Sequence, residues 1–240
     1  MHRHRLLALI LLAFTATAGR AQTVQLEYDL RHTVDPTNNE KNFPRLSFEV
    51  VRVLGYGNLL AKVDADFTGR NNNLGKLYAQ ISHTLRFWPV PVWLHLEYSG
   101  GLGLIGESTD GFAINNTFAV GAARPFQMMG SWASTFLAYR VTNFDTPSHD
   151  LMYSFWWGKD VHPRVGITAY VVLWTINRNH GDAWTEDLSG KEFVAIGEPQ
   201  VWFRLNDTFS VGSEVKLYYR VYSYSKRVLV YPTLAVQYSL

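Results

Sequence analysis

The strongest constraint on this chain is a two-residue alternation of apolar and polar side chains that recurs along most of its length. Successive side chains of a β-strand point to opposite faces of the sheet, so this alternation is typical of strands with one apolar and one polar face. It is clear over residues 24–31, 59–67, 92–99 and 228–240. A period of two, rather than the helical 3.6, therefore predicts an all-β protein.

Twelve segments follow the alternation. The predicted strands cover residues 24–32, 45–53, 58–68, 77–87, 92–99, 112–123, 131–142, 150–157, 164–176, 192–205, 209–221 and 227–239. A soluble β-sandwich would alternate in the same way, so the strands alone do not separate it from an antiparallel up-and-down barrel.

Alternate connections between these strands differ in average length. The odd connections, about ten residues long on average, are residues 33–44, 69–76, 100–111, 143–149, 177–191 and 222–226, and the even ones, about five residues long on average, are 54–57, 88–91, 124–130, 158–163 and 206–208. Long loops at one end and short turns at the other are typical of outer-membrane barrels. We therefore expect a transmembrane barrel with both termini on the short-turn, periplasmic side.

Tryptophan positions favour the same interpretation. Six of the 8 tryptophans lie within about four residues of an even connection, namely Trp88, Trp93, Trp132, Trp156, Trp157 and Trp202. This grouping predicts an aromatic girdle at one membrane interface, where amphipathic rings lie among lipid headgroups.

The N-terminus predicts export. Arg3 and Arg5 precede the apolar run 6–14, a pattern typical of a cleaved signal peptide over residues 1–21. A retained membrane anchor is the alternative, but the run is too short to span a bilayer as a helix. The expected mature barrel is residues 22–240.

Composition excludes several classes of protein. The chain has 240 residues, no cysteine, 18% charged residues and a formal net charge of +2. Without cysteine there is no disulfide scaffold or thiolate metal site, and a near-neutral charge argues against a nucleic-acid partner. No cofactor or metal motif is recognised. The expected partners are outer-membrane lipid, the barrel-assembly machinery during insertion, and a small polar solute.

The polar faces of the strands are expected to line a lumen, because charges facing lipid are costly. The candidate lumen or solute-binding residues are Glu27, Asp29, Lys62, Asp64, Arg86, His95, Glu97, Arg140, Glu198, Gln200, Glu214 and Lys216. Acids and bases balance, which fits either a salt-bridge network filling the barrel or a channel that favours neutral or zwitterionic solutes. Twelve strands permit a narrow pore without requiring one.

Two places break the alternation. Pro199 interrupts a predicted strand at Gly197-Glu198-Pro199-Gln200, which predicts a kink or bulge that directs Glu198 and Gln200 inward. His83 falls on the outward face, so we expect a bulge or a register shift near it.

Five segments resemble a family of exported bacterial proteins known as domain of unknown function 5020. They are VQLEYDL at 24–30, WLHLEYSGGLG at 93–103, INNTFAVGA at 114–122, IGEPQVWFRL at 196–205 and YPTLAVQYSL at 231–240. That family is similar to the nucleoside-specific channel-forming porins. The resemblance implies a monomeric twelve-stranded barrel with an aromatic-lined, ionisable lumen, and it assigns no substrate residues.

Three functions fit these observations. The first is a channel for passive diffusion of small polar solutes, nucleoside-like in the resemblance. The second is a structural or adhesive barrel with a closed lumen. The third is an outer-membrane hydrolase, which the sequence supports least, because none of the 8 histidines is followed by serine in a His-x-Ser pair. Acid–histidine pairs such as His95 with Glu97 or Asp64 would suit proteolysis only if they cluster at the extracellular rim, and no residue is assigned a catalytic role.

Overall fold

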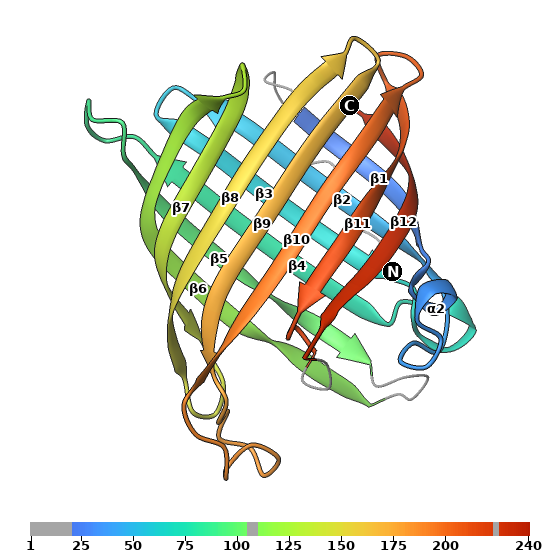
Figure 1. Cartoon of the computed structure of the whole chain (residues 1–240), viewed down its shortest axis with the longest axis vertical. Coiled ribbons are helices and arrows are strands. Elements are labelled where there is room, and N and C mark those ends of the chain that lie inside the picture. The colour runs from blue at the N-terminus through green and yellow to red at the C-terminus, as the bar shows by residue number, and fades with distance from the viewer. Residues whose placement is uncertain (1–20, 105–109, 223–225) are drawn as a thin grey trace, which may run out of the picture.

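The computed structural model describes residues 21–104, 110–222 and 226–240. These residues form one closed barrel in which each strand pairs with its sequence neighbours and β1 pairs with β12 (Figure 1). The strands are β1 (Ala21–Asp29), β2 (Phe43–Leu54), β3 (Gly57–Asp66), β4 (Lys76–Leu85), β5 (Trp93–Leu104), β6 (Gly111–Met128), β7 (Ser131–Thr142), β8 (Ser148–His162), β9 (Val165–Asn177), β10 (Lys191–Arg204), β11 (Phe209–Tyr219) and β12 (Val228–Ser239). All pairings are antiparallel, so the predicted up-and-down barrel of about twelve strands is confirmed.

Helix in the described residues is confined to α2 (Arg31–Val34) and the 3-10 turn η1 (Arg70–Asn72). Neither is long and apolar enough to cross a membrane. The predicted signal peptide lies outside the described residues, apart from Ala21 at the start of β1.

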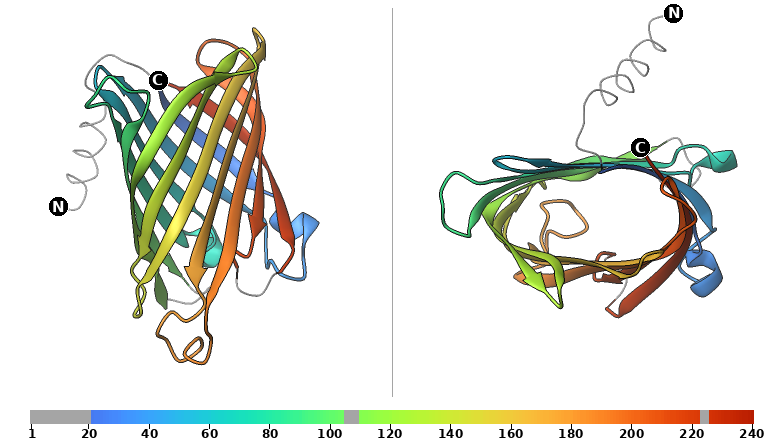
Figure 2. Two further views of the ribbon diagram at one scale, coloured as in Figure 1. Left: turned by 60° about the vertical axis from the view of Figure 1, so that its left-hand side comes forward. Right: turned by 90° about the horizontal axis from the view of Figure 1, so that it is seen from above.

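The two ends of the barrel differ in their connections (Figures 1 and 2). One end, the short-turn end, carries residues 55–56, 86–92, 129–130, 163–164 and 205–208. The opposite end, the long-loop end, carries residues 30–42, 67–75, 110, 143–147, 178–190, 220–222 and 226–227. The predicted difference in average loop length between the two ends is confirmed, although the short-turn connection 86–92 is longer than 143–147, and β1 begins and β12 ends at the short-turn end.

The outer surface of the barrel is apolar. Large hydrophobic side chains remain exposed around its circumference, for example Leu26, Leu96, Phe118, Leu151 and Val201. Their neighbours along each strand face inward and are more buried or polar, as Glu27 and His95 illustrate. An apolar outer face that alternates with a polar inner one is the surface of a transmembrane β-barrel.

The predicted loop 100–111 is wrong over its first half. β5 continues to Leu104, and the irregularity is a register shift against β6 between Ser99 and Gly101. A Cβ at Gly101 would lie 2.1 Å from the backbone oxygen of Leu77 in β4, so glycine is needed here for the close approach of two strands. The residues after Ser99 therefore pair as a strand rather than form a loop.

The predicted bulge at Pro199 is also wrong. β10 pairs with β9 without a break through Glu198↔Tyr170 and Pro199↔Ala169. On the β11 side the pairs Gly197↔Leu217 and Gln200↔Glu214 have the same register, and only the two pairs between them are missing. The proline therefore leaves a gap in one ladder, where it lacks an N–H donor, without bending the strand out of register.

No register shift occurs near His83. β4 pairs regularly with both β3 and β5, and His83 lies beside Leu59 and Leu96 on the outer face. Its ring packs near that of Tyr56, with ring centres 6.0 Å apart. The outward histidine is therefore a feature of the barrel, and the predicted bulge is wrong.

Candidate functional site: the barrel lumen

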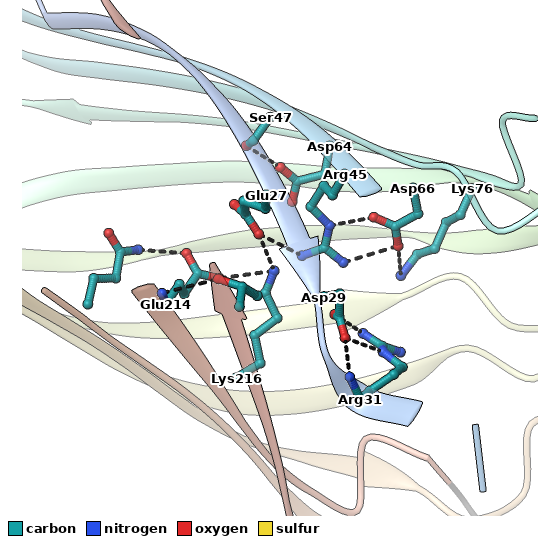
Figure 3. A network of polar contacts seen from close by, with 12 residues as sticks. Glu27, Asp29, Arg31, Arg45, Ser47, Asp64, Asp66, Lys76, Glu214 and Lys216 are labelled. Atoms are coloured by element: carbon teal, nitrogen blue, oxygen red, sulfur yellow. Dashed lines mark hydrogen bonds and ion pairs between the residues drawn. The ribbon is translucent and has the colours of Figure 1, made fainter. Parts of the chain in front are cut away.

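One wall of the lumen carries a continuous network of charged side chains (Figure 3). Lys216 of β11 is at its centre, with its Nζ 3.2 Å from Oε2 of Glu27 in β1 and 3.0 Å from Oε1 of Glu214. Arg45 of β2 reaches the same Glu27 oxygen at 3.9 Å. The three side chains Glu27, Glu214 and Lys216 are almost completely buried, at 3%, 2% and 1% exposed.

The network continues to β3 and β4 through Asp66, and a separate ion pair lies on the same face of β3. Arg45 donates two hydrogen bonds to Asp66, the longer at 3.1 Å from Nη2 to Oδ2, and Lys76 lies 4.0 Å from the same oxygen. Asp64 accepts a hydrogen bond from Ser47 and lies 3.5 Å from Lys62. Lys62 and Asp64 are more exposed than the central trio, so they present charge to the lumen.

In the other direction the network reaches β10. Gln200 donates a hydrogen bond of 2.8 Å to Glu214, and Trp202 donates one of 2.9 Å to the amide oxygen of Gln200. Buried charges are tolerated when they are paired and hydrogen-bonded, and removal of one partner is strongly destabilising. We therefore assign Glu27, Glu214 and Lys216 chiefly to the structure of this wall, which we call the ionic wall.

Asp29 anchors the long-loop end of the ionic wall. Its carboxylate accepts hydrogen bonds from the Arg31 backbone N–H at 2.9 Å and from Arg31 Nη2 at 2.8 Å. The Arg31 guanidinium lies between the rings of Phe43 and Tyr231, 4.8 Å from each centre. Burial disfavours this charge, but the hydrogen bonds to Asp29 and the electrostatic attraction of Tyr222, Asp29 and Tyr218 together raise the pKa of Arg31 above its ordinary value.

The opposite wall is apolar and aromatic. Its inward-facing core consists of Ala119, Ala138, Met152 and Val172, contributed by β6 to β9, and Tyr170, Trp174 and Ile196 pack against it. Trp156 lies against Tyr170, with ring centres 4.2 Å apart. We call this surface the aromatic wall.

The predicted lipid-facing tryptophan girdle is wrong for four of its members. Trp93 is on the same face of β5 as His95, and Trp132 is on the same face of β7 as Arg140. Trp156 lies on the lumen face of β8, and Trp202 is 8% exposed and bonded to Gln200. All four side chains are on the lumen-facing side of their strands in the half nearer the short-turn end, with Trp132 52% exposed beside the turn, whereas Trp157 points outward. Sequence reasoning therefore misplaced these four tryptophans, although the family resemblance implied an aromatic-lined lumen.

His95 and Glu97 lie next to each other on the lumen face of β5, nearer the short-turn end. His95 is fully buried and stacked on Phe136, with ring centres 4.2 Å apart. Its Nε2 is 3.4 Å from Glu97 Oε2, and its Nδ1 is 3.3 Å from the Thr84 hydroxyl. The imidazole is thus packed between fixed partners, far from the long-loop rim where a proteolytic pair was considered.

The remaining candidates divide into two groups. Glu198 and Arg140 face the lumen, as predicted, from β10 and β7. Arg86 does not line the strand-enclosed lumen, because β4 ends at Leu85 and Arg86 is an exposed residue of the 86–92 connection. Within the described ranges, no group of three or more histidine, aspartate or glutamate side chains is placed to hold a metal ion.

The closed antiparallel barrel, its apolar exterior and its charged lumen together define a transmembrane β-barrel protein. The chain belongs to the family described as Domain of unknown function (DUF5020), whose profile matches residues 21–240. The family resemblance of the sequence segments is thereby confirmed. A comparison with curated protein sequences finds no match.

Solved structures with a similar fold include three barrels of low sequence identity. The translocator domain of the autotransporter NalP from Neisseria meningitidis aligns with 8% identity and a TM-score of 0.47, over 98% of this chain and 93% of that one. The outer membrane channel DcaP of Acinetobacter baumannii aligns with 11% identity and a TM-score of 0.41, over 95% of this chain and 99% of that one. A porin refined at 1.8 Å resolution gives 10% identity and a TM-score of 0.40, over 82% of this chain, which spans 62% of that porin.

Proposed function

We propose that the protein is an outer-membrane channel for passive diffusion of small polar solutes, with nucleoside-like solutes as the substrate class. The observation that carries the proposal is the two-sided lumen, in which the ionic wall faces the aromatic wall. A solute with one planar or apolar face and one polar edge matches both surfaces at once. The short-turn end, with both termini of the barrel, is the periplasmic end in this proposal.

A nucleoside has this pair of faces. Its base can stack on the rings of Trp156 and Tyr170, which meet at 4.2 Å on the aromatic wall. Its ribose hydroxyls can exchange hydrogen bonds with the accessible charges of the ionic wall, such as Lys62 and Asp64. The protein acts in this role as a monomer that catalyses no reaction, surrounded by outer-membrane lipid after insertion by the barrel-assembly machinery.

Liposome flux tests the proposal. Liposomes that contain the folded protein should become permeable to uridine, whereas protein-free liposomes remain closed to it. Trp156→Leu should slow uridine entry more than entry of glycerol, because only uridine has a ring to stack. Trp157→Leu is the matched control, since Trp157 is the next residue on the outer face, and its uridine flux should equal that of the unmodified protein. Folded protein that admits neither solute would contradict the proposal.

A further inference from the structure

Arg140 differs from every other basic side chain on the lumen face of the described strands. The others each have an acidic partner within 4.0 Å: Arg45 and Lys76 with Asp66, Lys62 with Asp64, Arg204 with Asp160, and Lys216 with Glu27 and Glu214. Arg140 makes one hydrogen bond, a long one of 3.4 Å from Nη2 to the hydroxyl of Thr117. Its Nη1 is shielded from solvent and has no hydrogen-bond partner.

The acid expected to pair with Arg140 is already satisfied. Asp150 lies directly opposite Arg140 in the β7–β8 register. Its Oδ2 accepts a hydrogen bond of 2.7 Å from Ser148, and its Oδ1 accepts bonds from Thr175 at 3.1 Å and Lys191 at 2.7 Å. Three donors therefore bind the Asp150 carboxylate, and the Arg140 guanidinium remains available to bind another anion.

A second unpaired donor lies beside Arg140. The Arg140 guanidinium carbon is 4.8 Å from the ring centre of Trp174 on β9, and the indole Nε1 is shielded from solvent without a partner. Buried donors are normally hydrogen-bonded, and leaving one unpaired is costly. Two such donors at one place indicate an acceptor that the chain itself does not supply.

The position of this pair suits a solute entering from outside. Arg140 is close to the end of β7 at Thr142, and Trp174 is close to the end of β9 at Asn177, both at the long-loop end. Both residues are only partly buried as whole side chains, so they reach the lumen. Trp174 also packs on the apolar core of Met152 and Val172, which continues inward along the aromatic wall.

We propose that Arg140 and Trp174 form a carboxylate-binding subsite at the long-loop mouth, for small solutes that carry an apolar body beside the carboxylate. A carboxylate offers a planar pair of acceptors that matches a guanidinium. A single cation balances a single negative charge, and a phosphate dianion would meet repulsion from Asp150 and Glu97, which act on Arg140 electrostatically. The adjoining apolar wall accounts for the body of the solute.

This proposal rests on the proposed function in one respect: the solute must be able to enter the barrel at its long-loop end. Binding to the subsite is therefore tested separately from solute flux through the barrel. The probe is benzoate, with benzamide as its neutral counterpart, measured by ligand-observed NMR on the purified full chain in detergent. Benzoate should bind more tightly than both benzamide and inorganic phosphate. Arg140→Gln should weaken benzoate binding by about tenfold or more, the usual effect of losing a charged hydrogen bond.

Two further variants distinguish a loss of binding from a folding defect in Arg140→Gln. Trp174→Phe keeps an aromatic six-membered ring but removes the pyrrole half of the indole with its N–H, and it should weaken benzoate binding by a smaller factor. Arg124→Gln makes the same change of charge at an exposed residue on the outer face of β6, and it should bind benzoate as the unmodified protein does.

The outcomes separate the two proposals. Arg140-dependent benzoate binding without solute flux in liposomes supports the subsite and contradicts the channel. Solute flux with no benzoate binding, or with binding unchanged in both Arg140→Gln and Trp174→Phe, overturns the subsite. Tighter Arg140-dependent binding of phosphate than of benzoate overturns the assignment to carboxylates.

Discussion

Lys216 offers the sharpest test of the ionic wall. Replacement by methionine keeps the length of the side chain but leaves Glu214 and Glu27 buried without their shared cation at 3.0 and 3.2 Å. Glu214 then retains the neutral Gln200 amide, and Glu27 retains Arg45 only at 3.9 Å. Because Lys216 is 1% exposed, solvent screening does not reduce the loss. Breaking such a buried pair lowers the free energy of unfolding by about 3–5 kcal/mol.

The measurement is urea unfolding of the detergent-solubilised barrel, followed by tryptophan fluorescence. Lys159→Met is the matched control, because Lys159 lies near a turn, where its Nζ donates to the backbone oxygen of Met129 at 2.8 Å. Its loss should cost less than about 1 kcal/mol. A second variant, Lys216→Met with Glu214→Gln, should recover part of the lost free energy of unfolding, because it removes one of the two carboxylates left without their cation. If Lys216→Met unfolds within about 1 kcal/mol of the unmodified protein, the network is not the stabilising element we describe.

Three further predictions follow from the barrel. Gly101→Ala should lower the free energy of unfolding by at least about 1–3 kcal/mol, since its Cβ would lie 2.1 Å from a backbone oxygen of β4, whereas Gly111→Ala, with its nearest atom at 3.4 Å, should be tolerated. The double variant Glu97→Gln with Glu198→Gln should lower the permeability of cations relative to anions, seen as a shift of the reversal potential in a KCl gradient, and an unchanged potential would place both residues off the path. His83→Leu should raise the free energy of unfolding in the same urea assay by about 1 kcal/mol, because the buried Nε2 on the outer face has no hydrogen-bond partner, and a loss of stability would show that this nitrogen is satisfied.

The alternation of side chains was sufficient to predict the class of fold, the approximate strands and the facing of most charged residues. It also contained a signal for two of the lumen tryptophans that we did not use. Trp93 is two residues before His95, Trp202 is two residues after Gln200, and an even offset places both on the polar face. Grouping near the short turns was read as a lipid interface, although the parity of these positions pointed inward.

Other features depend on spatial relations that a single sequence does not display. Lys216 and Glu27 meet across β12, which lies between their strands, so their pairing follows from the stagger of the closed barrel. Asp150 is likewise paired with Lys191, a residue two strands away, and the sequence alone does not show this ion pair. At Gly101, glycine is compatible with either a loop or a close strand contact, and only the approach of Leu77 decides between them.

Single-channel current across a planar lipid bilayer tests the central claim, an open lumen with an ionic wall facing an aromatic one, most directly. Folded protein should give discrete conductance steps in KCl, and uridine should reduce the current reversibly, with a weaker reduction in Trp156→Leu than in Trp157→Leu. Protein that inserts in its folded form and gives no conductance steps would contradict an open lumen. Steps that uridine leaves unchanged would contradict the binding role of the aromatic wall.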